Sequence, residues 1–142
     1  MNVNVELIPI KKSHYKFLYR LLQERDDSIN ISHRKIPEYT DHCMFWELKP
    51  YPQAHIISYT DEAGCGFEMA GYCYVTDRNE IGIFLDKPHQ GVGLGKAVVQ
   101  TLLEMMEGDA IANISPRNYR SRKFFEDLGF ELVQLTLRKD GS

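Results

Sequence analysis

The sequence element best suited to chemistry is a short glycine-rich turn, Gln90-Gly91-Val92-Gly93-Leu94-Gly95, between an expected strand and an expected helix. Glycines at alternate positions permit unusual backbone angles and leave main-chain amides open to a ligand. Those amides lie at the positive end of the following helix, which favours an anion and most naturally a phosphate. Lys96 adds a positive charge in the first helical turn. The alternative interpretation is that the glycines only end a strand and start a helix.

Two common phosphate-binding patterns do not fit this turn. A Walker loop needs GxxxxGK[ST], and no such arrangement follows Gly91. A dinucleotide fingerprint needs GxGxxG in the first βαβ unit and an acidic residue near the end of the next strand. Here the spacing is GxGxG, the turn follows three strands expected to be antiparallel, and the next strand offers only Asn113. Both patterns are excluded.

The periodicity of the chain predicts the elements that position the turn. Strands are expected at residues 3–7, 55–59, 69–76, 80–85, 110–114 and 131–137. Helices are expected from Ser13 to 26–27, over 38–48 with Met44, Phe45 and Trp46 buried, from the turn to 106 with Met105 and Met106 inward, and over 118–128. Gly129 suits the left-handed residue that closes the last helix. The short gaps between the three central strands predict hairpins and a mixed α/β fold with a largely antiparallel sheet.

Length and composition predict one globular domain over residues 1–142. The chain has 43% hydrophobic and 26% charged residues, close to the globular average. A net charge of -3 argues against a protein dedicated to nucleic acids. Three cysteines without a CxxC pair, and five histidines without HxxxH or HExxH spacing, predict no metal site. Neither a leader-like start nor an apolar run of ~20 residues is present, so we expect a cytoplasmic protein with no membrane partner.

Two motifs resemble those of the GCN5-related N-acetyltransferase (GNAT) superfamily. Gln90-x-x-Gly93-x-Gly95 resembles its [R/Q]-x-x-G-x-[G/A] signature, and residues 118–130, NYRSRKFFEDLGF, resemble its later helix motif, N-x-x-[AS]-x-x-[FL]-Y-x-x-[LG]-G-F. Residues 80–85 resemble the fourth strand of that fold. The resemblance implies an α/β (α+β) fold: a mixed, mostly antiparallel sheet of six to seven strands, about four helices, and a splayed fourth and fifth strand pair.

The resemblance also implies an activity and a cosubstrate. It predicts an acetyl-CoA-dependent N-acetyltransferase that acts by direct transfer in a ternary complex. The acceptor would be a primary amine of a small molecule, such as an amino sugar, an amino acid derivative or a polyamine. A protein or peptide N-acetyltransferase is an alternative acceptor class. A CoA-binding module without catalysis is an alternative of another class.

The resemblance assigns the cofactor to three segments. Main-chain groups of Ile83, Phe84 and Leu85 would pair with the pantetheine arm as a pseudo-strand. The turn would wrap the pyrophosphate through Gln90, Gly91, Val92, Gly93, Leu94, Gly95 and Lys96. Asn118 and Ser121 would meet the cofactor from the opposite side. The basic cluster, defined as Arg117, Arg120, Arg122 and Lys123, either attracts the nucleotide end or is an ordinary solvated helix face.

The catalytic assignment rests on Glu80, at the start of the fourth strand. An alkylammonium group has a pKa near 10.4 and must lose a proton before it attacks a thioester. Glu80 would accept that proton, directly or through a water; otherwise it is a solvated carboxylate at a hairpin end. The amide near Leu85 would stabilise the oxyanion. Many relatives carry Tyr where this chain has Phe125, so the thiolate would take its proton from Ser121 or from water.

The acceptor site is assigned least directly. The resemblance places the aperiodic segment with His33 and Arg34 over the acceptor, although a plain surface loop is the alternative. Tyr74 and Asn113 complete the predicted substrate residues. A homodimer interface, formed by the last strand or by the Met44-Phe45-Trp46 surface, is a further possibility.

Overall fold

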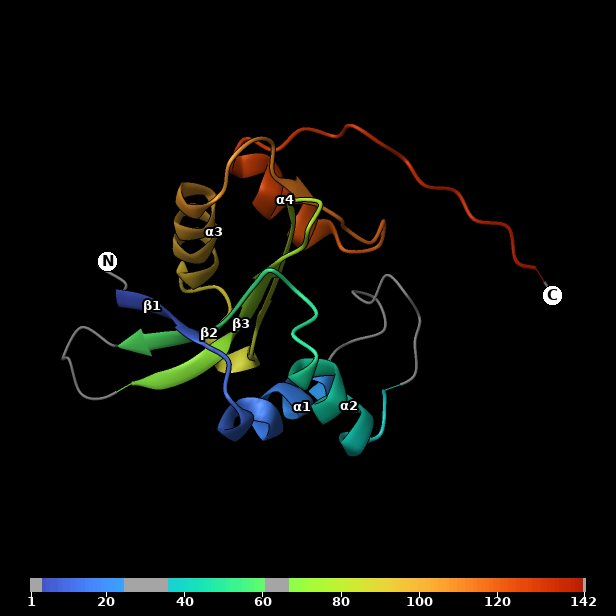
Figure 1. The fold of residues 1–142 in the computed structure, drawn as a ribbon. Coiled ribbons are helices and arrows are strands. Elements are labelled where there is room, and N and C mark those ends of the chain that lie inside the picture. The colour runs from blue at the N-terminus through green and yellow to red at the C-terminus, as the bar shows by residue number, and fades with distance from the viewer. Residues whose placement is uncertain (1–3, 25–35, 61–66, 142) are drawn as a thin grey trace.

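The computed structural model describes residues 4–24, 36–60 and 67–141 (Figure 1). The strands are β1 (Asn4–Pro9), β2 (Gln53–Thr60), β3 (Glu68–Val75), β4 (Glu80–Leu85) and β5 (Ile111–Ala112). The helices are α1 (Tyr15–Glu24), α2 (Tyr39–Glu47), α3 (Leu94–Met105) and α4 (Tyr119–Asp127), with short 3₁₀ turns η1 (Lys12–His14) and η3 (Lys87–His89). The expected helices and the first five expected strands are all present in the described chain.

The five strands form one sheet in sequence order, β1 to β5. The first four are antiparallel neighbours, as the hairpin lengths predict, and β5 joins β4 in parallel. Asn79 turns the β3–β4 hairpin with a positive φ of 58°. Its side-chain amide donates to the carbonyl oxygens of Glu107 (2.7 Å) and Asp109 (3.3 Å), which fixes the segment that enters β5.

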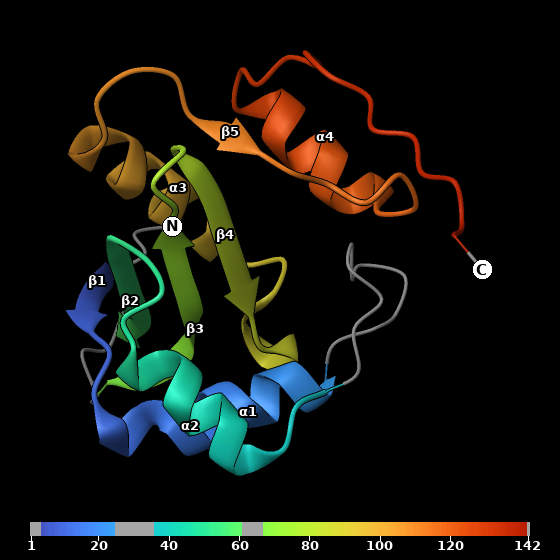
Figure 2. The same cartoon turned by 45° about the vertical axis from the view of Figure 1, so that its right-hand side comes forward.

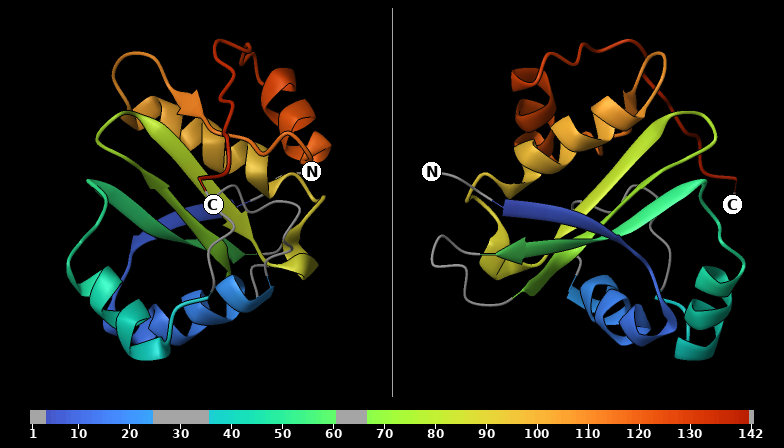
Figure 3. Two further views of the ribbon diagram at one scale, coloured as in Figure 1. Left: turned by 90° about the vertical axis from the view of Figure 1, so that its right-hand side faces the viewer. Right: turned by 60° about the vertical axis from the view of Figure 1, so that its left-hand side comes forward.

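Helices cover both faces of the sheet, and each face has its own core. Residues such as Ile57 and Cys73 pack against Val98 and Leu102 of α3. The neighbouring residues along the strands point the other way, because side chains alternate across a sheet, and there Ile56 packs with residues of α1 and α2. Figures 2 and 3 show α1 and α2 together at one end of the molecule and α3 near α4 at the other.

The predicted strand at 131–137 does not form within this chain, and the described residues make a sheet of five strands rather than six to seven. Residues 130–141 form neither helix nor strand. The segment has the alternation of apolar and polar residues that favours a strand, but a strand also needs a neighbouring strand to bond with. No described strand lies beside this segment.

Some side chains expected in the core are exposed. On α2, Trp46 is buried, whereas Met44 and Phe45 are 59% and 44% exposed. Met105, near the end of α3, is 45% exposed. Each of these helices presents only one face to the sheet, so a run of consecutive apolar residues cannot be buried as a whole. Ser13 lies inside η1 rather than capping α1.

Candidate active site

The gap between β4 and β5 is the central feature of the candidate site. The two strands pair only at Glu80 with Ile111 and at Ile81 with Ala112, after which they separate. The amide of Asp86 donates to Ala70 on β3, and the amide of Thr76 donates to Glu80. Since bonding direction alternates along a strand, the backbone groups of Ile83 and Leu85 point away from β3 and into the gap. The predicted splay is confirmed.

The two sides of β4 differ in which backbone groups are available to a ligand. Phe84 turns its carbonyl oxygen toward β3, 1.9 Å from where a Cβ on Gly71 would lie, so its backbone faces the sheet. The side-chain amide of Gln90 donates to the Leu85 carbonyl oxygen at 2.9 Å. Gln90 therefore ties the glycine-rich turn to the end of β4. The Leu85 N–H and both backbone groups of Ile83 face the gap, with no β5 residue opposite them.

The glycine-rich turn has the backbone that an anion site needs. Gly91 and Gly93 have φ values of 76° and 87°, and Gly93 is the N-cap of α3. A Cβ at either glycine would meet no atom within 4 Å, so the space beside the turn is open. The first amides of a helix have no partner inside it. In this helix they belong to residues 94–96, and they lie next to that open space.

The remaining residues of the turn have different roles. Leu94 is fully buried in the α3 core, and Lys96 is exposed. A Cβ at Gly95 would lie 3.1 Å from the Phe124 ring. Gly95 thus lets α4 approach the first turn of α3. It is a packing glycine, and the sequence pattern alone does not separate it from Gly91 and Gly93.

Glu80 is held in a fixed position at the other end of β4. It is half-buried. The Thr76 hydroxyl donates to one carboxylate oxygen at 3.0 Å, and the side-chain amide of Asn113 donates to the other. Asn113, predicted as a substrate residue, contacts Glu80 directly. Thr76 was missed by the sequence analysis, because its role depends on its place opposite Glu80 across the hairpin.

Tyr74 lies on the same face of the sheet as Glu80. It pairs with Gly82, and its ring fills the space above that glycine, where a Cβ would lie 2.1 Å from the ring. The Tyr74 ring stacks on Tyr51 with centroids 4.0 Å apart and planes 7° apart. Tyr72 and Phe84 stack beside them at 4.9 Å. These four rings form an aromatic cluster on the sheet face that also carries Glu80. Tyr51, set between two prolines, has no sequence pattern that predicts its place in the cluster.

Asn118 and Ser121 begin α4. The Asn118 side-chain oxygen accepts a hydrogen bond from the Ser121 amide at 3.1 Å, so Asn118 is the N-cap of the helix. Ser121 is half-buried and shares a helix face with Phe124, three residues later, which packs against Gly95. Ser121 therefore lies on the side of α4 nearest the turn. Phe125 is 5% exposed and packs on Phe124 and Phe130.

A charged cluster supports the entry to the turn, and the sequence analysis missed it. His89 in η3 contacts Asp86 through Nδ1 and Glu68 through Nε2, the second at 2.9 Å. Arg20 of α1 lies 3.6 Å from the buried Asp86 carboxylate. Tyr59 of β2 packs its ring edge-on against His89, with centroids 5.7 Å apart. Burial lowers the pKa of His89, but the bonds with Asp86 and Glu68 outweigh that effect and raise it.

This cluster predicts a pH dependence of stability. Because the folded pKa of His89 is raised, its stabilisation is fully present below about pH 6.5 and is lost as the pH rises through the folded value. We expect His89→Gln to lower the free energy of unfolding at pH 6 by on the order of 1 kcal/mol, and by less at pH 9. Urea denaturation at both pH values measures this. If the two proteins differ in free energy of unfolding by the same amount at both pH values, the prediction is contradicted. His42 and His55 are present in both proteins, so their titration cancels in this comparison.

The basic cluster divides into two pairs. Arg122 bonds to Glu126 at 3.3 Å and Lys123 to Asp127 at 3.6 Å, each one turn along α4. Arg117 and Arg120 are exposed and have no ion pair among the described residues. The second half of the cluster is thus a solvated, internally paired helix face. The charges of Arg117 and Arg120, at the start of the helix, remain available to an anionic ligand.

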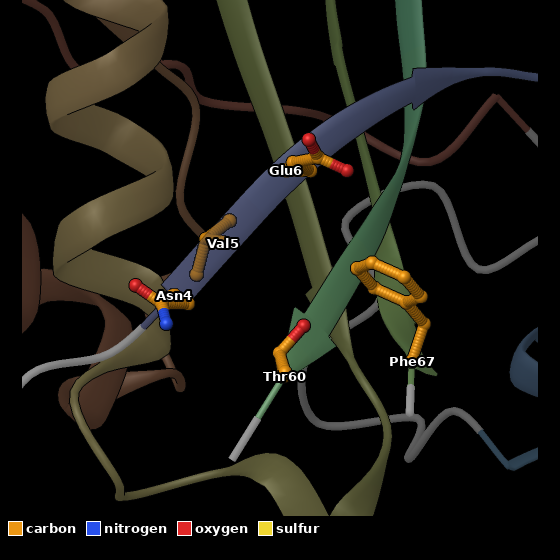
Figure 4. Close-up of a pocket in the computed structure, with 5 residues that line it drawn as sticks. All are labelled: Asn4, Val5, Glu6, Thr60 and Phe67. Carbon is orange, nitrogen blue, oxygen red and sulfur yellow. The ribbon is translucent and has the colours of Figure 1, made fainter. Parts of the chain in front are cut away.

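Other predictions fall outside this site. His33 and Arg34 lie outside the described residues. In residues 4–24, 36–60 and 67–141, no three His, Cys, Asp or Glu side chains are arranged to hold a metal ion. No helix in the same ranges is long and apolar enough to cross a membrane. A cavity of about 410 Å³ lies at the far edge of the sheet beside β1, with Thr60 and Phe67 on its wall, and contains no predicted site residue (Figure 4).

Known proteins share both the sequence profile and the fold. The acetyltransferase (GNAT) family profile matches residues 17–130. A domain from Methanocaldococcus jannaschii superposes with a TM-score of 0.82 at 20% identity, covering 94% of this chain and 92% of that one. YncA, a putative acetyltransferase from Salmonella typhimurium solved with its cofactor acetyl-CoA, gives 0.66 at 16% identity, covering 92% and 80%.

A third similar structure is the dodecameric spermidine N-acetyltransferase from Vibrio cholerae. Its TM-score is 0.64 at 13% identity, and the match covers 91% of this chain and 79% of that one. No curated protein sequence matches the chain. The family profile spans both the glycine-rich turn and the α4 motif, which are the two parts of the site argued above. The chain belongs to the GNAT family of acetyltransferases.

Proposed function

We propose that the protein transfers an acetyl group from acetyl-CoA to a primary amine of a small molecule. The observation that carries this proposal is the separation of β4 from β5 beside the glycine-rich turn. The Ile83 and Leu85 backbone groups suit a peptide-like pantetheine arm, and the free amides at the start of α3 suit a pyrophosphate. The open space beside Gly91 and Gly93 leaves room for that group. The acetyl-CoA bound to the Salmonella neighbour supports this choice of cosubstrate.

The chemistry removes two protons from the acceptor nitrogen and supplies one to the sulfur. Glu80, oriented by Thr76 and Asn113, accepts a proton from the acceptor ammonium, directly or through a water. The amine nitrogen then attacks the thioester carbon, and the Leu85 amide stabilises the oxyanion. As the C–N bond forms the C–S bond breaks. The thiolate takes a proton from Ser121 or from water, because the buried Phe125 ring has none to give. The second proton that the nitrogen loses as the amide forms returns to Ser121 or passes to water.

The acceptor is a small primary amine, and a polyamine is one of its candidate classes. The aromatic cluster on the sheet face of Glu80 includes the half-buried rings of Tyr51 and Tyr74, and aromatic rings attract alkylammonium groups. The Vibrio cholerae neighbour is a spermidine N-acetyltransferase, which favours the polyamine class among the small amines. We place the acceptor nitrogen between Tyr74 and Glu80.

Free-thiol release tests the proposed reaction. The protein is incubated with acetyl-CoA and, separately, with spermidine, an amino sugar and an amino acid amide. Release of thiol with at least one amine, above the rate without amine, is the expected result. Calorimetric binding of acetyl-CoA with no release on any amine would overturn catalysis and favour a CoA-binding module, for which Phe125 is the supporting observation.

The two halves of the basic cluster predict different effects on cosubstrate affinity. We expect Arg117→Ala/Arg120→Ala to raise the Kd for acetyl-CoA about tenfold at low salt, because unpaired arginines attract phosphate most strongly. Arg122→Ala/Lys123→Ala removes the same charge from groups already paired with Glu126 and Asp127. It should change the Kd less than about twofold. Isothermal titration measures the Kd of both variants. Equal changes in Kd would contradict the assignment of Arg117 and Arg120 to the cosubstrate.

A further inference from the structure

Among the residues that the structure describes, the segment after Phe130 holds a run of exposed apolar side chains without a place in the fold. The Phe130 amide bonds to the Phe125 carbonyl, and its ring packs against the core. Beyond it the chain leads away from α4 and the sheet toward the C-terminus (Figure 1). Four aliphatic side chains there are 62% to 94% exposed: Leu132, Val133, Leu135 and Leu137. Exposed apolar groups that are contiguous in this way mark an interaction site.

This segment has the composition of a strand. Val133, Leu135 and Leu137 alternate with Gln134, Thr136 and Arg138, so an extended backbone places the three aliphatic residues on one face. Residues 131–138 contain no Gly or Pro to interrupt a ladder. Their backbone groups bond to no other described residue. A strand in this state needs an edge to pair with.

The sheet offers such an edge at β5. It is the last strand of the sheet, and the edge that faces away from β4 has no strand beside it in the described chain. Ile111 is 40% exposed there. The strand is only two residues long, which is short for an element at the centre of a larger sheet. An added strand on this side would lengthen it by pairing.

The partner that fits both features is a second copy of this chain. Each copy carries one unpaired strand and one open edge, so a twofold arrangement in which the segments are exchanged satisfies both at once. In Figure 2, α4 lies between β5 and the end of the segment of the same chain. A different protein would pair with either the segment or the β5 edge. The other of the two would stay unpaired and prone to aggregation.

We propose that residues 131–137 add as a strand to the β5 edge of a second copy, and that two copies exchange these segments in a symmetric dimer. The aliphatic face of the segment covers apolar surface of the receiving molecule, and the face with Gln134 and Thr136 meets solvent. The proposal concerns assembly and holds whether or not the acetyl transfer proposed above takes place.

A pair of matched variants tests the face that carries the contact. Val133→Asp/Leu135→Asp and Gln134→Asp/Thr136→Asp add the same charge to the same segment. We expect the unaltered protein to have twice the 16.5-kDa chain mass by light scattering. The first variant should dissociate at least tenfold more readily, and the second should stay dimeric. Circular dichroism confirms that both remain folded. A monomeric unaltered protein, or variants that behave alike, would overturn the proposal.

Isotope-filtered NMR then tests the exchange itself. In a dimer mixed from labelled and unlabelled chains, we expect nuclear Overhauser contacts between residues 133–137 of one chain and residues 111–112 of the other. Contacts between these residues within one chain only, or none in a stable dimer, would overturn strand exchange.

Discussion

Replacement of Glu80 by glutamine should lower kcat about a hundredfold or more and leave the Kd for acetyl-CoA unchanged. Glutamine has nearly the same shape and can keep its contact with Thr76. The Asn113 amide can rotate to present its oxygen to the new side-chain nitrogen, so the local structure should survive. What is lost is the ability to accept a proton from the acceptor ammonium. Steady-state kinetics with a saturating amine measure kcat, and isothermal titration measures the Kd.

The pH profile separates a lost base from a merely disturbed site. An alkylamine with a pKa near 10.4 gains about a hundredfold in its neutral form between pH 7 and pH 9. The Glu80→Gln protein depends entirely on that neutral fraction, so its rate should climb steeply with pH. The gap between the two proteins should therefore narrow toward pH 9. A defect of the same size at every pH would mean that Glu80 acts through structure and not as a base.

Asn113→Ala provides the matched positioning control. It removes one bond to the Glu80 carboxylate but leaves the carboxylate itself and its bond with Thr76. Its kcat should fall by about tenfold, less than in Glu80→Gln, and the steep rise with pH should be absent. An Asn113→Ala defect equal to that of Glu80→Gln would instead place the essential group at Asn113.

Features that depend on neighbouring residues in the chain were predictable from sequence. The glycine-rich turn, the α4 helix and the three central strands all follow from short-range spacing, and the structure has them where expected. The parting of β4 and β5 followed from the family resemblance carried by the same motifs. Motifs of this kind fix local backbone geometry, so they transfer without knowledge of the rest of the fold.

Features that depend on distant partners were not predictable. The alternation at 131–137 predicts a strand, yet the described chain offers it no neighbour. The contacts of His89 with Glu68 and Tyr59 come from β3 and β2, the contact of Asp86 with Arg20 comes from α1, and these residues have no common spacing. Single-sequence patterns record only which face of an element is apolar. They do not record which element lies against that face.

Gly71 and Gly82 lie within strands and have close neighbours from other strands that the sequence does not reveal. Substitution of Gly71 should cause a large loss of stability. A Cβ at Gly71 would lie 1.9 Å from the Phe84 carbonyl oxygen and 2.9 Å from the Leu85 Cα, which are backbone atoms that no rotamer change can move. We expect Gly71→Ala to lower the free energy of unfolding by about 3 kcal/mol. Relief of the clash must shift the end of β4, so the Kd for acetyl-CoA should rise as well. Chemical denaturation and isothermal titration measure the two effects.

Gly82→Ala is the control that identifies the cause. Its Cβ would lie 2.1 Å from the ring of Tyr74, which is a side chain and can be trimmed. Gly82→Ala/Tyr74→Ala should therefore be less destabilised than the sum of its single changes, with a coupling of about 1–3 kcal/mol. Gly71→Ala combined with the same Tyr74→Ala should be additive, because the Gly71 clash involves the backbone. Additivity in both pairs would mean that the sheet backbone shifts as easily as the Tyr74 side chain. The edge of β4 would then not be fixed by its contact with β3.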